Sequence, residues 1–283
     1  LEVAKLLSVL CHPESPTLDA MLAGEKPLQR VASVLIPATA GTGSEVTNIA
    51  ILTTHDDSKM GIVSPQLYGD LVLLDAQLTL GLPPVHTAAA GIDAMVHAIE
   101  AYTGKHKKNP LSDALAREAL RLISRHLVTA CRDGNNREAR ENVLLGAMLA
   151  GQAFANSPVA AVHALAYPLG ARHHIPHGLS NALMLIPVLQ FNASAAAPLY
   201  GALAAVSGVK VTGDVANDAR SFIAGMVKII AATGAPNRLR DVDVPEKDLP
   251  LLAHDAMQQT RLLDNNPVTL TEDDALRLYQ QAF

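Results

Sequence analysis

Apolar residues follow two different patterns along the chain, and the change falls near residue 80. Before it, short apolar runs typical of strands alternate with turn residues, at 31–36, 48–54 and 71–75. After the segment 80–84, apolar residues recur at helical spacing, as in 115–129, 142–155 and 221–232. The pattern therefore predicts a sheet-containing part, residues 1–81, followed by a nearly all-helical part, residues 82–283.

Local signals mark individual helix ends. A capping hydroxyl at Thr271 precedes the carboxylates of residues 272–274, which predicts a helix start, and Gly234 followed by Pro236 predicts a helix stop. The opening residues 1–7 have the composition of a helix already under way, with no N-cap, initiating Met or signal peptide. We therefore expect the natural chain to begin further upstream.

Composition narrows the class of protein. The chain has 283 residues, 49% of them hydrophobic and 17% charged, which is enough to fill a core in each of two domains. A formal net charge of -5 argues against nucleic-acid binding. With nucleic acid disfavoured by this charge, we expect small-molecule partners. Two cysteines, Cys11 and Cys131, suit a reducing compartment, so we expect a cytoplasmic protein. The longest apolar run, 182–191, is interrupted by Pro187, and no membrane span is expected.

The predicted helix 91–102 carries a first chemical signal. Asp93 and His97 stand four residues apart, so both side chains project from one face. Such a pair can hold one metal ion from the same side. Taken alone, the pair is better explained as a buried hydrogen-bonded Asp–His pair or as an exposed pair on a helix.

A histidine cluster at residues 162–178 strengthens the metal interpretation, because it holds four of the 11 histidines. Pro168 and Pro176 are expected to break the helix, placing His163 on a helix and His177 on the following loop. The other two, His173 and His174, are more simply explained as exposed loop residues. One carboxylate with up to three imidazoles suits Fe(II) or Zn(II), and an open coordination position points to catalysis.

A glycine-containing segment at residues 36–47 follows the first predicted strand. It has neither the third glycine of a Rossmann fingerprint nor the Lys-Ser/Thr of a P-loop. Its backbone amides and hydroxyls could meet a cofactor phosphate or ribose. An ordinary hairpin turn would have the same composition, so both interpretations stay open.

Three motifs in this order, residues 37–45, 91–102 and 163–181, together resemble iron-containing (group III) alcohol dehydrogenases. The segment 263–267, followed by a terminal helix, is similar to the ending of that family. The resemblance implies an α/β dinucleotide-binding domain, here truncated at its start, and then an all-α metal-binding domain. It also implies that the reaction takes place in the cleft between the two domains and transfers a hydride between NAD or NADP and a small alcohol, aldehyde or ketone. The family resemblance further implies a homodimer.

The same resemblance assigns roles to individual residues. The metal ligands of the family fall on Asp93, His97, His163 and His177. Its cofactor contacts fall on the loop residues Ala38, Thr39, Gly41 and Thr42, then on Thr47 and on the basic residue Lys59.

The chain departs from the family in two respects. The Gly-Gly-Gly-Ser pyrophosphate loop and the ribose-binding Asp of the family would lie before Leu1, so the choice between NAD and NADP is not readable. Tyr167 stands where many members carry a His near the nicotinamide. Because a phenol has a pKa of about 10, we expect Tyr167 to orient the nicotinamide or substrate and not to relay the proton.

Two other classes of enzyme share parts of this pattern. A maleylacetate-reductase-like enzyme of the same superfamily would reduce a carbon–carbon double bond or a keto acid. A metal-dependent hydrolase or lyase would use the Asp and His residues without nicotinamide. A third alternative is a metal-binding scaffold without activity.

Overall fold

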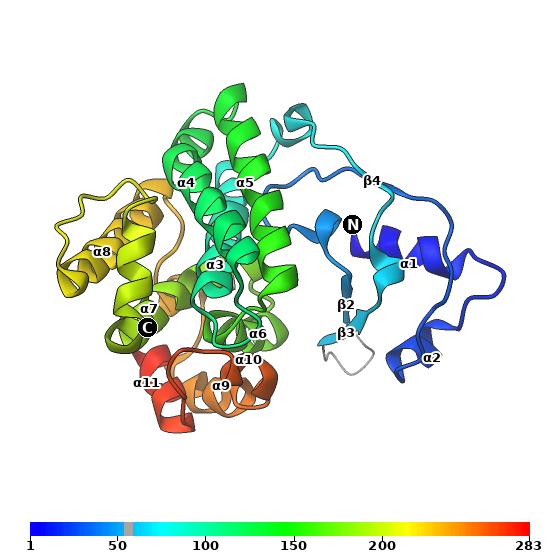
Figure 1. Cartoon of the computed structure of the whole chain (residues 1–283). Helices are drawn as coiled ribbons and strands as arrows, with labels where there is room; N and C mark the ends of the chain where they lie inside the picture. Colours follow the sequence, from blue (N-terminus) through cyan, green and yellow to red (C-terminus); the bar gives the residue numbers. More distant parts are fainter. Residues whose placement is uncertain (54–58) are drawn as a thin grey trace.

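The computed structural model describes residues 1–53 and 59–283, which form an N-terminal α/β part and a larger helical part (Figure 1). The N-terminal part contains two helices, four strands and three short 3-10 helices in its described residues. In chain order these are α1 (Glu2–Leu10), α2 (Leu18–Leu22), β1 (Val34–Leu35), η1 (Ser44–Val46), β2 (Ile49–Thr53), β3 (Lys59–Val63), η2 (Pro65–Leu67), β4 (Leu71–Val72) and η3 (Ala76–Thr79).

The strands of this part form two small sheets. β1 and β4 pair in parallel with Val34 opposite Leu71, whereas β2 and β3 pair antiparallel with Ile49 opposite Val63. The predicted runs were longer than β1 and β4, because apolar composition does not reveal where backbone pairing stops. The strand β3 was not predicted at all. A small core of Leu6, Val9, Met21, Ala50, Ile62 and Leu67 holds α1 and α2 against β2, β3 and η2.

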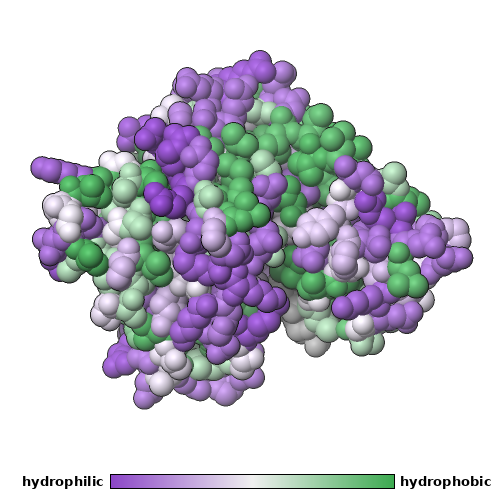
Figure 2. All heavy atoms as spheres, viewed as in Figure 1, coloured by the Kyte–Doolittle hydropathy of each residue, from purple (hydrophilic) through white to green (hydrophobic). Residues whose placement is uncertain are grey.

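Apolar side chains also reach the surface of this part. The sheet formed by β1 and β4 and its flanks expose Val34, Ile36, Leu71 and Leu73. Figure 2 shows apolar surface gathered toward the upper right of the molecule, in the region where Figure 1 places these segments. The N-terminal part is thus less completely covered than the helical part.

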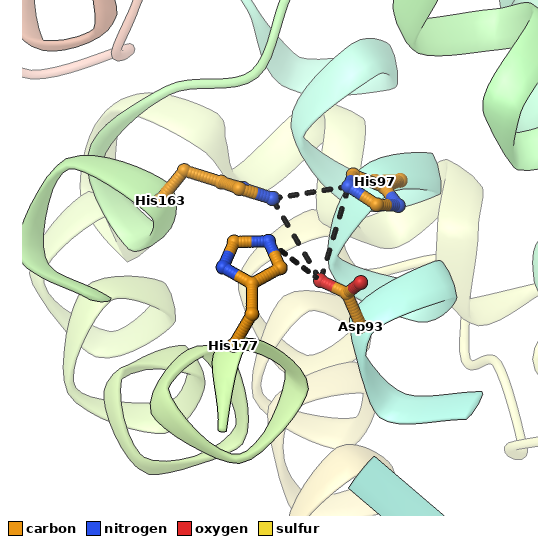
Figure 3. A group of neighbouring side chains, drawn as sticks. All are labelled: Asp93, His97, His163 and His177. Atoms are coloured by element: carbon orange, nitrogen blue, oxygen red, sulfur yellow. Dashed lines mark hydrogen bonds and ion pairs between the residues drawn. The ribbon is translucent and has the colours of Figure 1, made fainter. Parts of the chain in front are cut away.

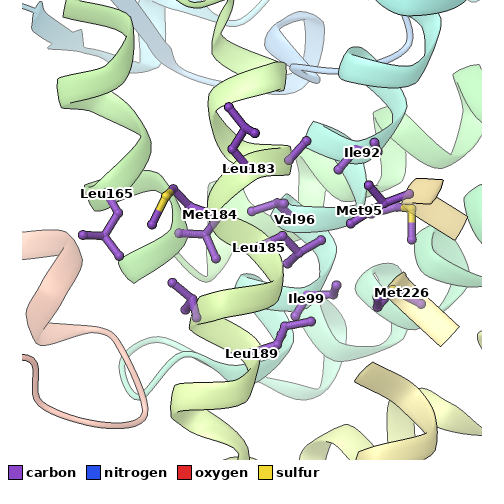
Figure 4. Close-up of a cluster of buried hydrophobic side chains, with 14 of the residues drawn as sticks. Ile92, Met95, Val96, Ile99, Leu165, Leu183, Met184, Leu185, Leu189 and Met226 are labelled. Atoms are coloured by element: carbon purple, nitrogen blue, oxygen red, sulfur yellow. The ribbon is translucent and has the colours of Figure 1, made fainter. Parts of the chain in front are cut away.

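Residues 84–283 are helical with no strand, which confirms the predicted all-α part. The helices are α3 (Pro84–Thr103), α4 (Pro110–Arg132), α5 (Arg137–Asn156), α6 (Ala161–His173), α7 (His177–Ala204), α8 (Val215–Thr233), α9 (Leu249–Ala256), α10 (Thr260–Asp264) and α11 (Glu272–Ala282), with short 3-10 helices η4 (Leu239–Val242) and η5 (Glu246–Asp248). Helix α3 is buried along almost its whole length and packs against α4, α5, α7 and α8 (Figure 4). Its apolar residues, among them Ile92, Met95, Val96 and Ile99, fill the centre of the core.

The predicted capping signals are confirmed. Thr271 and Asp274 form a capping box at the start of α11, and Gly234 ends α8 in the left-handed conformation with φ of 74°. The division of the chain at residues 81 and 82 stays a prediction. Helix α3 begins two residues beyond it, at Pro84.

Two expectations about proline were wrong. Pro168 lies inside α6 and does not end it. The chain does break between His163 and His177, because α6 ends at His173 and Pro176 is the N-cap of α7, but His177 is the first residue of α7 and not a loop residue. Pro187 and Pro198 lie inside α7, which continues for 28 residues. A proline removes one hydrogen bond of a helix, and the dense packing around α6 and α7 outweighs that loss.

Because α7 continues through Pro187, its apolar run is longer than expected from the sequence. By length and composition α7 could cross a membrane, although half of its most apolar 18-residue window is buried inside the protein. The core helix of a soluble protein has the same properties, so α7 is weak evidence for a span.

Candidate metal centre

Helix α3 presents a stripe of polar side chains inside the apolar core. Asp93, His97 and Glu100 recur at intervals of four and three residues, so they lie on one face of the helix. All three are almost fully buried. Such a stripe is costly to bury unless its members are paired or hold a metal ion.

The four residues singled out in the sequence come together at this stripe (Figure 3). Asp93 Oδ1 lies 3.8 Å from Nε2 of His97, 3.8 Å from Nε2 of His163 and 3.6 Å from Nε2 of His177. The Nε2 atoms of His97 and His163 are 3.0 Å apart. Metal bonds of about 2.1 Å in a tetrahedral arrangement separate the ligand atoms by about 3.4 Å, so this donor set fits one divalent ion.

The charge states of Asp93 and His97 also suit a metal. Burial opposes ionisation of Asp93, but the three imidazoles and the amide of Asn181 outweigh it and hold the pKa of Asp93 below its usual value. Burial lowers the pKa of His97 to about 3, against the opposing attraction of Asp93. An ionised carboxylate and a neutral imidazole are the forms that bind metal.

Three residues that the sequence analysis missed surround the group. Glu100 Oε2 lies 2.7 Å from Nδ1 of His163, and the amide nitrogen of Asn181 donates to Asp93 Oδ1 at 2.6 Å. Phe154 stacks on His97 with ring centroids 4.4 Å apart. Helical spacing could have identified two of them, because Glu100 follows Asp93 by seven residues and Asn181 follows His177 by four. No sequence signal pointed to Phe154.

A cleft of about 240 Å³ opens beside the metal-binding group. One wall is the glycine-containing loop, through Thr39, Gly41 and Thr42, and the other is made by α3 and the start of α7. Asp93 and His177 contribute to the lining, together with Leu82, His86, Ala89, Ala90, Pro176 and Gly178. The predicted loop and two of the four predicted metal residues, Asp93 and His177, therefore face one shared space.

His86 is a further residue that the sequence analysis missed. His86 lines the cleft and precedes Asp93 by seven residues, so both lie on the same face of α3. This helical spacing was the sequence signal that could have identified His86.

The remaining predicted cofactor residues have other positions. Ala38 is exposed and does not line the cleft. Thr47 is buried, and its hydroxyl and carbonyl oxygens both accept hydrogen bonds from Lys5 at 3.1 Å. The side chain of Lys59 lies outside the part of the chain that the structure describes.

The buried ammonium of Lys5 holds the C-terminal end of the glycine-containing loop. Besides its bonds to Thr47, it donates to the carbonyl oxygens of Ser44 at 2.8 Å and Ile49 at 2.6 Å. Burial lowers the pKa of Lys5 to about 8, although Glu2 and Glu45 act in the opposite direction. Lys5 therefore joins α1 to the segment that follows the glycines.

Gly43 makes a second contact of this loop, with helix α5. Its φ is 58°, and a Cβ there would lie only 2.5 Å from the Cα of Gly151 in α5. A larger residue fits neither the left-handed conformation nor the close approach. The loop is thereby held against the helix that also carries Phe154.

Tyr167 lies close to the metal-binding group without belonging to it. Its ring centroid is 6.0 Å from that of His177 and 6.3 Å from that of His163. Burial, followed by the nearby charge of Glu100, raises the pKa of Tyr167 to about 12. The phenol therefore keeps its proton at neutral pH.

His173 and His174 lie outside the group, as expected. His173 ends α6 with its Nε2 3.7 Å from Oδ2 of Asp248, and His174 adopts φ of 54° beyond the helix end. Contrary to the expectation of two exposed loop residues, His173 is helical and only partly exposed.

The glycine-containing loop of the α/β part faces one Asp and three His residues of the helical part across a cleft. This arrangement is typical of an enzyme with a metal site beside its ligand cleft. The family model described as "Iron-containing alcohol dehydrogenase" matches residues 1–76, and "Fe-containing alcohol dehydrogenase family, C-terminal" matches residues 87–283. The chain belongs to the iron-containing alcohol dehydrogenase family and is an oxidoreductase.

Individual relatives agree with this placement. The chain is 40% identical to long-chain-alcohol dehydrogenase 1 of Geobacillus thermodenitrificans over 290 residues, covering 100% of this chain and 72% of that protein. The structure is similar to that of a 1,3-propanediol oxidoreductase, with a TM-score of 0.93 and 34% identity over 100% of this chain and 74% of the other. It is also similar to the sulfoacetaldehyde reductase from Bifidobacterium kashiwanohense in complex with NAD+, with a TM-score of 0.89 and 28% identity over 99% and 73% of the two chains.

Proposed function

We propose that this protein transfers a hydride between NAD or NADP and a small alcohol, aldehyde or ketone, in the cleft between the glycine-containing loop and α3. The supporting observation is that Thr39, Gly41 and Thr42 line the same cleft as Asp93 and His177. A cofactor held by the loop would then lie beside a substrate held at the metal. The names of the relatives, which describe an alcohol dehydrogenase and an aldehyde reductase, support this class of substrate.

We assign Asp93, His97, His163 and His177 as the ligands of one divalent metal ion, iron in the first place and zinc as the alternative. When bound, such an ion acts as a Lewis acid that polarises the substrate oxygen. The four side chains come from α3, α6 and α7, so the packing of three helices sets the geometry. Structural zinc sites are usually closed by thiolates. Because this set contains a carboxylate and no thiolate, it is more typical of an Fe(II) site than of a structural zinc site.

The other residues of the cleft orient the reactants. The backbone of residues 38–42 is proposed to meet the cofactor, and Thr42 offers an exposed hydroxyl there. Tyr167 keeps its proton, so it can donate a hydrogen bond to the nicotinamide or substrate. The reacting carbon then lies between two fixed walls, and hydride transfer itself belongs to the nicotinamide.

The test is turnover by the intact, metal-loaded protein. Oxidation of NADH and NADPH is followed with short aldehydes and ketones, and reduction of NAD and NADP with the corresponding alcohols. Asp93→Asn and His177→Ala should abolish turnover and bound metal together, whereas His254→Ala, an exposed histidine, should change neither. Reduction of a carbon–carbon double bond in place of a carbonyl would favour the maleylacetate-reductase-like alternative. Hydrolysis or elimination without any nicotinamide would contradict the proposal.

We also propose a cytoplasmic homodimer. The two cysteines are both free, which suits a reducing compartment. Light scattering on the intact protein gives the mass in solution, and a monomer at working concentration would contradict the dimer.

A further inference from the structure

The carboxylate of Glu100 joins helices α3 and α6 through two contacts. Glu100 lies on α3, one turn beyond His97, and is buried. Its Oε1 accepts a hydrogen bond from the backbone N–H of Val162 at 2.7 Å, and its Oε2 lies 2.7 Å from Nδ1 of His163. The side chain thus contacts both the start of α6 and the imidazole carried by its first turn.

The contact with Val162 replaces a missing cap. The N-cap residue of α6, Ala160, has no side chain that can accept a hydrogen bond from the first turn. A carboxylate at a helix N-terminus satisfies a free N–H and interacts favourably with the helix dipole. The segment before α6 is tied to α3 a second time, because Ser157 Oγ donates to the carbonyl of Ala101 at 2.7 Å.

The contact with His163 decides which nitrogen carries the proton. A carboxylate can only accept, so Nδ1 of His163 must donate to Glu100 Oε2. In the neutral ring the lone pair then lies on Nε2, which is the atom 3.8 Å from Asp93 Oδ1 and 3.0 Å from Nε2 of His97. Asn181 Nδ2, an amide donor, lies 3.2 Å from the same Nε2, which is consistent with this tautomer. The nitrogen that faces the other proposed ligands therefore carries no proton and can offer its lone pair to a metal.

We propose that Glu100 is a positioning residue for the metal centre: it holds His163 in the tautomer that presents Nε2 to the ion and fixes the first turn of α6 in register with α3. Helix α3 then supplies two of the proposed ligands and controls a third. This inference rests on the proposed metal site. Residues that support metal ligands in this way generally contribute 10–100-fold to metal affinity.

Glu100→Gln separates the two contacts. The single oxygen of glutamine can still accept from Val162, but its NH₂ group then faces Nδ1 of His163 and donates to it. The proton of His163 must move to Nε2, where it blocks metal binding. A residue needed only for packing or capping would be replaced by glutamine without loss. Glu141→Gln, on the exposed surface of α5, removes a charge without touching the site and is the matched control.

The first measurement is zinc and cobalt affinity of the intact protein by competition with a chromophoric chelator. Glu100→Gln should bind each metal about 10–100-fold more weakly, and Glu141→Gln should bind as the wild type does. Equal affinity in Glu100→Gln and wild type would overturn the inference.

The second measurement needs no metal and reads the tautomer in the wild-type protein, with one variant used only to assign the signal. In ¹⁵N-histidine-labelled, metal-free wild-type protein at pH 8, long-range ¹H–¹⁵N spectra should show the proton of His163 on Nδ1, with His163→Gln used to assign the signal. A proton on Nε2 would overturn the inference. If the wild type bound no metal but kept the proton on Nδ1, the proposed metal site would fail while the tautomer assignment stood.

Discussion

Gly178, the second residue of α7, lies directly against the backbone of Ala89 in α3. A Cβ at Gly178 would overlap the carbonyl oxygen of Ala89 and come within 2.8 Å of its carbonyl carbon. This close approach places His177 within 3.6 Å of Asp93. The absence of a side chain at residue 178 is therefore part of the geometry of the metal-binding group.

Gly178→Ala should push the start of α7 away from α3. We expect a loss of about 1–3 kcal/mol in the free energy of unfolding, the usual cost of overpacking, and a weaker affinity for zinc because His177 moves. Gly170→Ala in α6 is the control, since a Cβ there meets nothing closer than 3.5 Å. Chelator competition and denaturant unfolding measure both effects. Unchanged metal affinity in Gly178→Ala would separate the glycine from the site.

The burial of His97 predicts acid sensitivity of the metal-free protein. The pKa of His97 is about 3 in the folded state and about 6.5 in the unfolded chain. Between these pH values the unfolded chain binds a proton that the folded protein does not, so the free energy of unfolding should fall as the pH drops from about 6.5 toward 3. For one group the slope is at most about 1.4 kcal/mol per pH unit.

Denaturant unfolding at pH 7, 6 and 5 measures this slope. His97→Gln should give a shallower dependence than wild type, whereas His254→Gln, an exposed histidine, should leave it unchanged. Parallel profiles for wild type and His97→Gln would show that His97 is not the group responsible.

Short-range spacing explains how much of the site could be predicted from the sequence. Asp93 and His97 were found because a helix brings residues four apart to one face, and the same rule applied further would have found Glu100. The all-helical part was predictable because long amphipathic segments carry a strong periodic signal. Phe154 could not be predicted, because only the packing of α5 against α3 places it on His97.

The prediction that Pro168 and Pro187 interrupt helices failed for a different reason. Local propensity disfavours Pro168 and Pro187 inside a helix, but tertiary packing decides the outcome in α6 and α7. Strand lengths failed for a related reason. The run at 31–36 is apolar apart from Ser33, yet only Val34 and Leu35 have a pairing partner in the described chain.

Tyr167→Phe tests the role of the phenol. Because the pKa of Tyr167 is raised to about 12, the group should not exchange protons near neutral pH. We expect kcat to fall by no more than about tenfold, or KM to rise, with metal content unchanged. A loss of several orders of magnitude in kcat, with metal and cofactor still bound, would make Tyr167 the proton-transferring residue.

Lys5→Met tests the connection between α1 and the glycine-containing loop. The change keeps most of the side-chain volume but leaves the carbonyls of Ser44, Thr47 and Ile49 without their common donor. We expect several-fold weaker binding of NADH or NADPH and a lower Tm, with zinc affinity unchanged because the metal residues lie in the helical part. Lys26→Met, at an exposed position, is the control. Wild-type nucleotide affinity in Lys5→Met would show that the loop needs no such support.

The four-ligand assignment is tested most directly by anomalous X-ray scattering from crystals of the metal-loaded protein, recorded on both sides of the iron and zinc absorption edges. The account predicts a single strong peak within about 2.0–2.3 Å of Asp93 Oδ1 and of Nε2 of His97, His163 and His177. A peak bound by other residues, or no peak at this group in protein that carries one metal ion per chain, would contradict it.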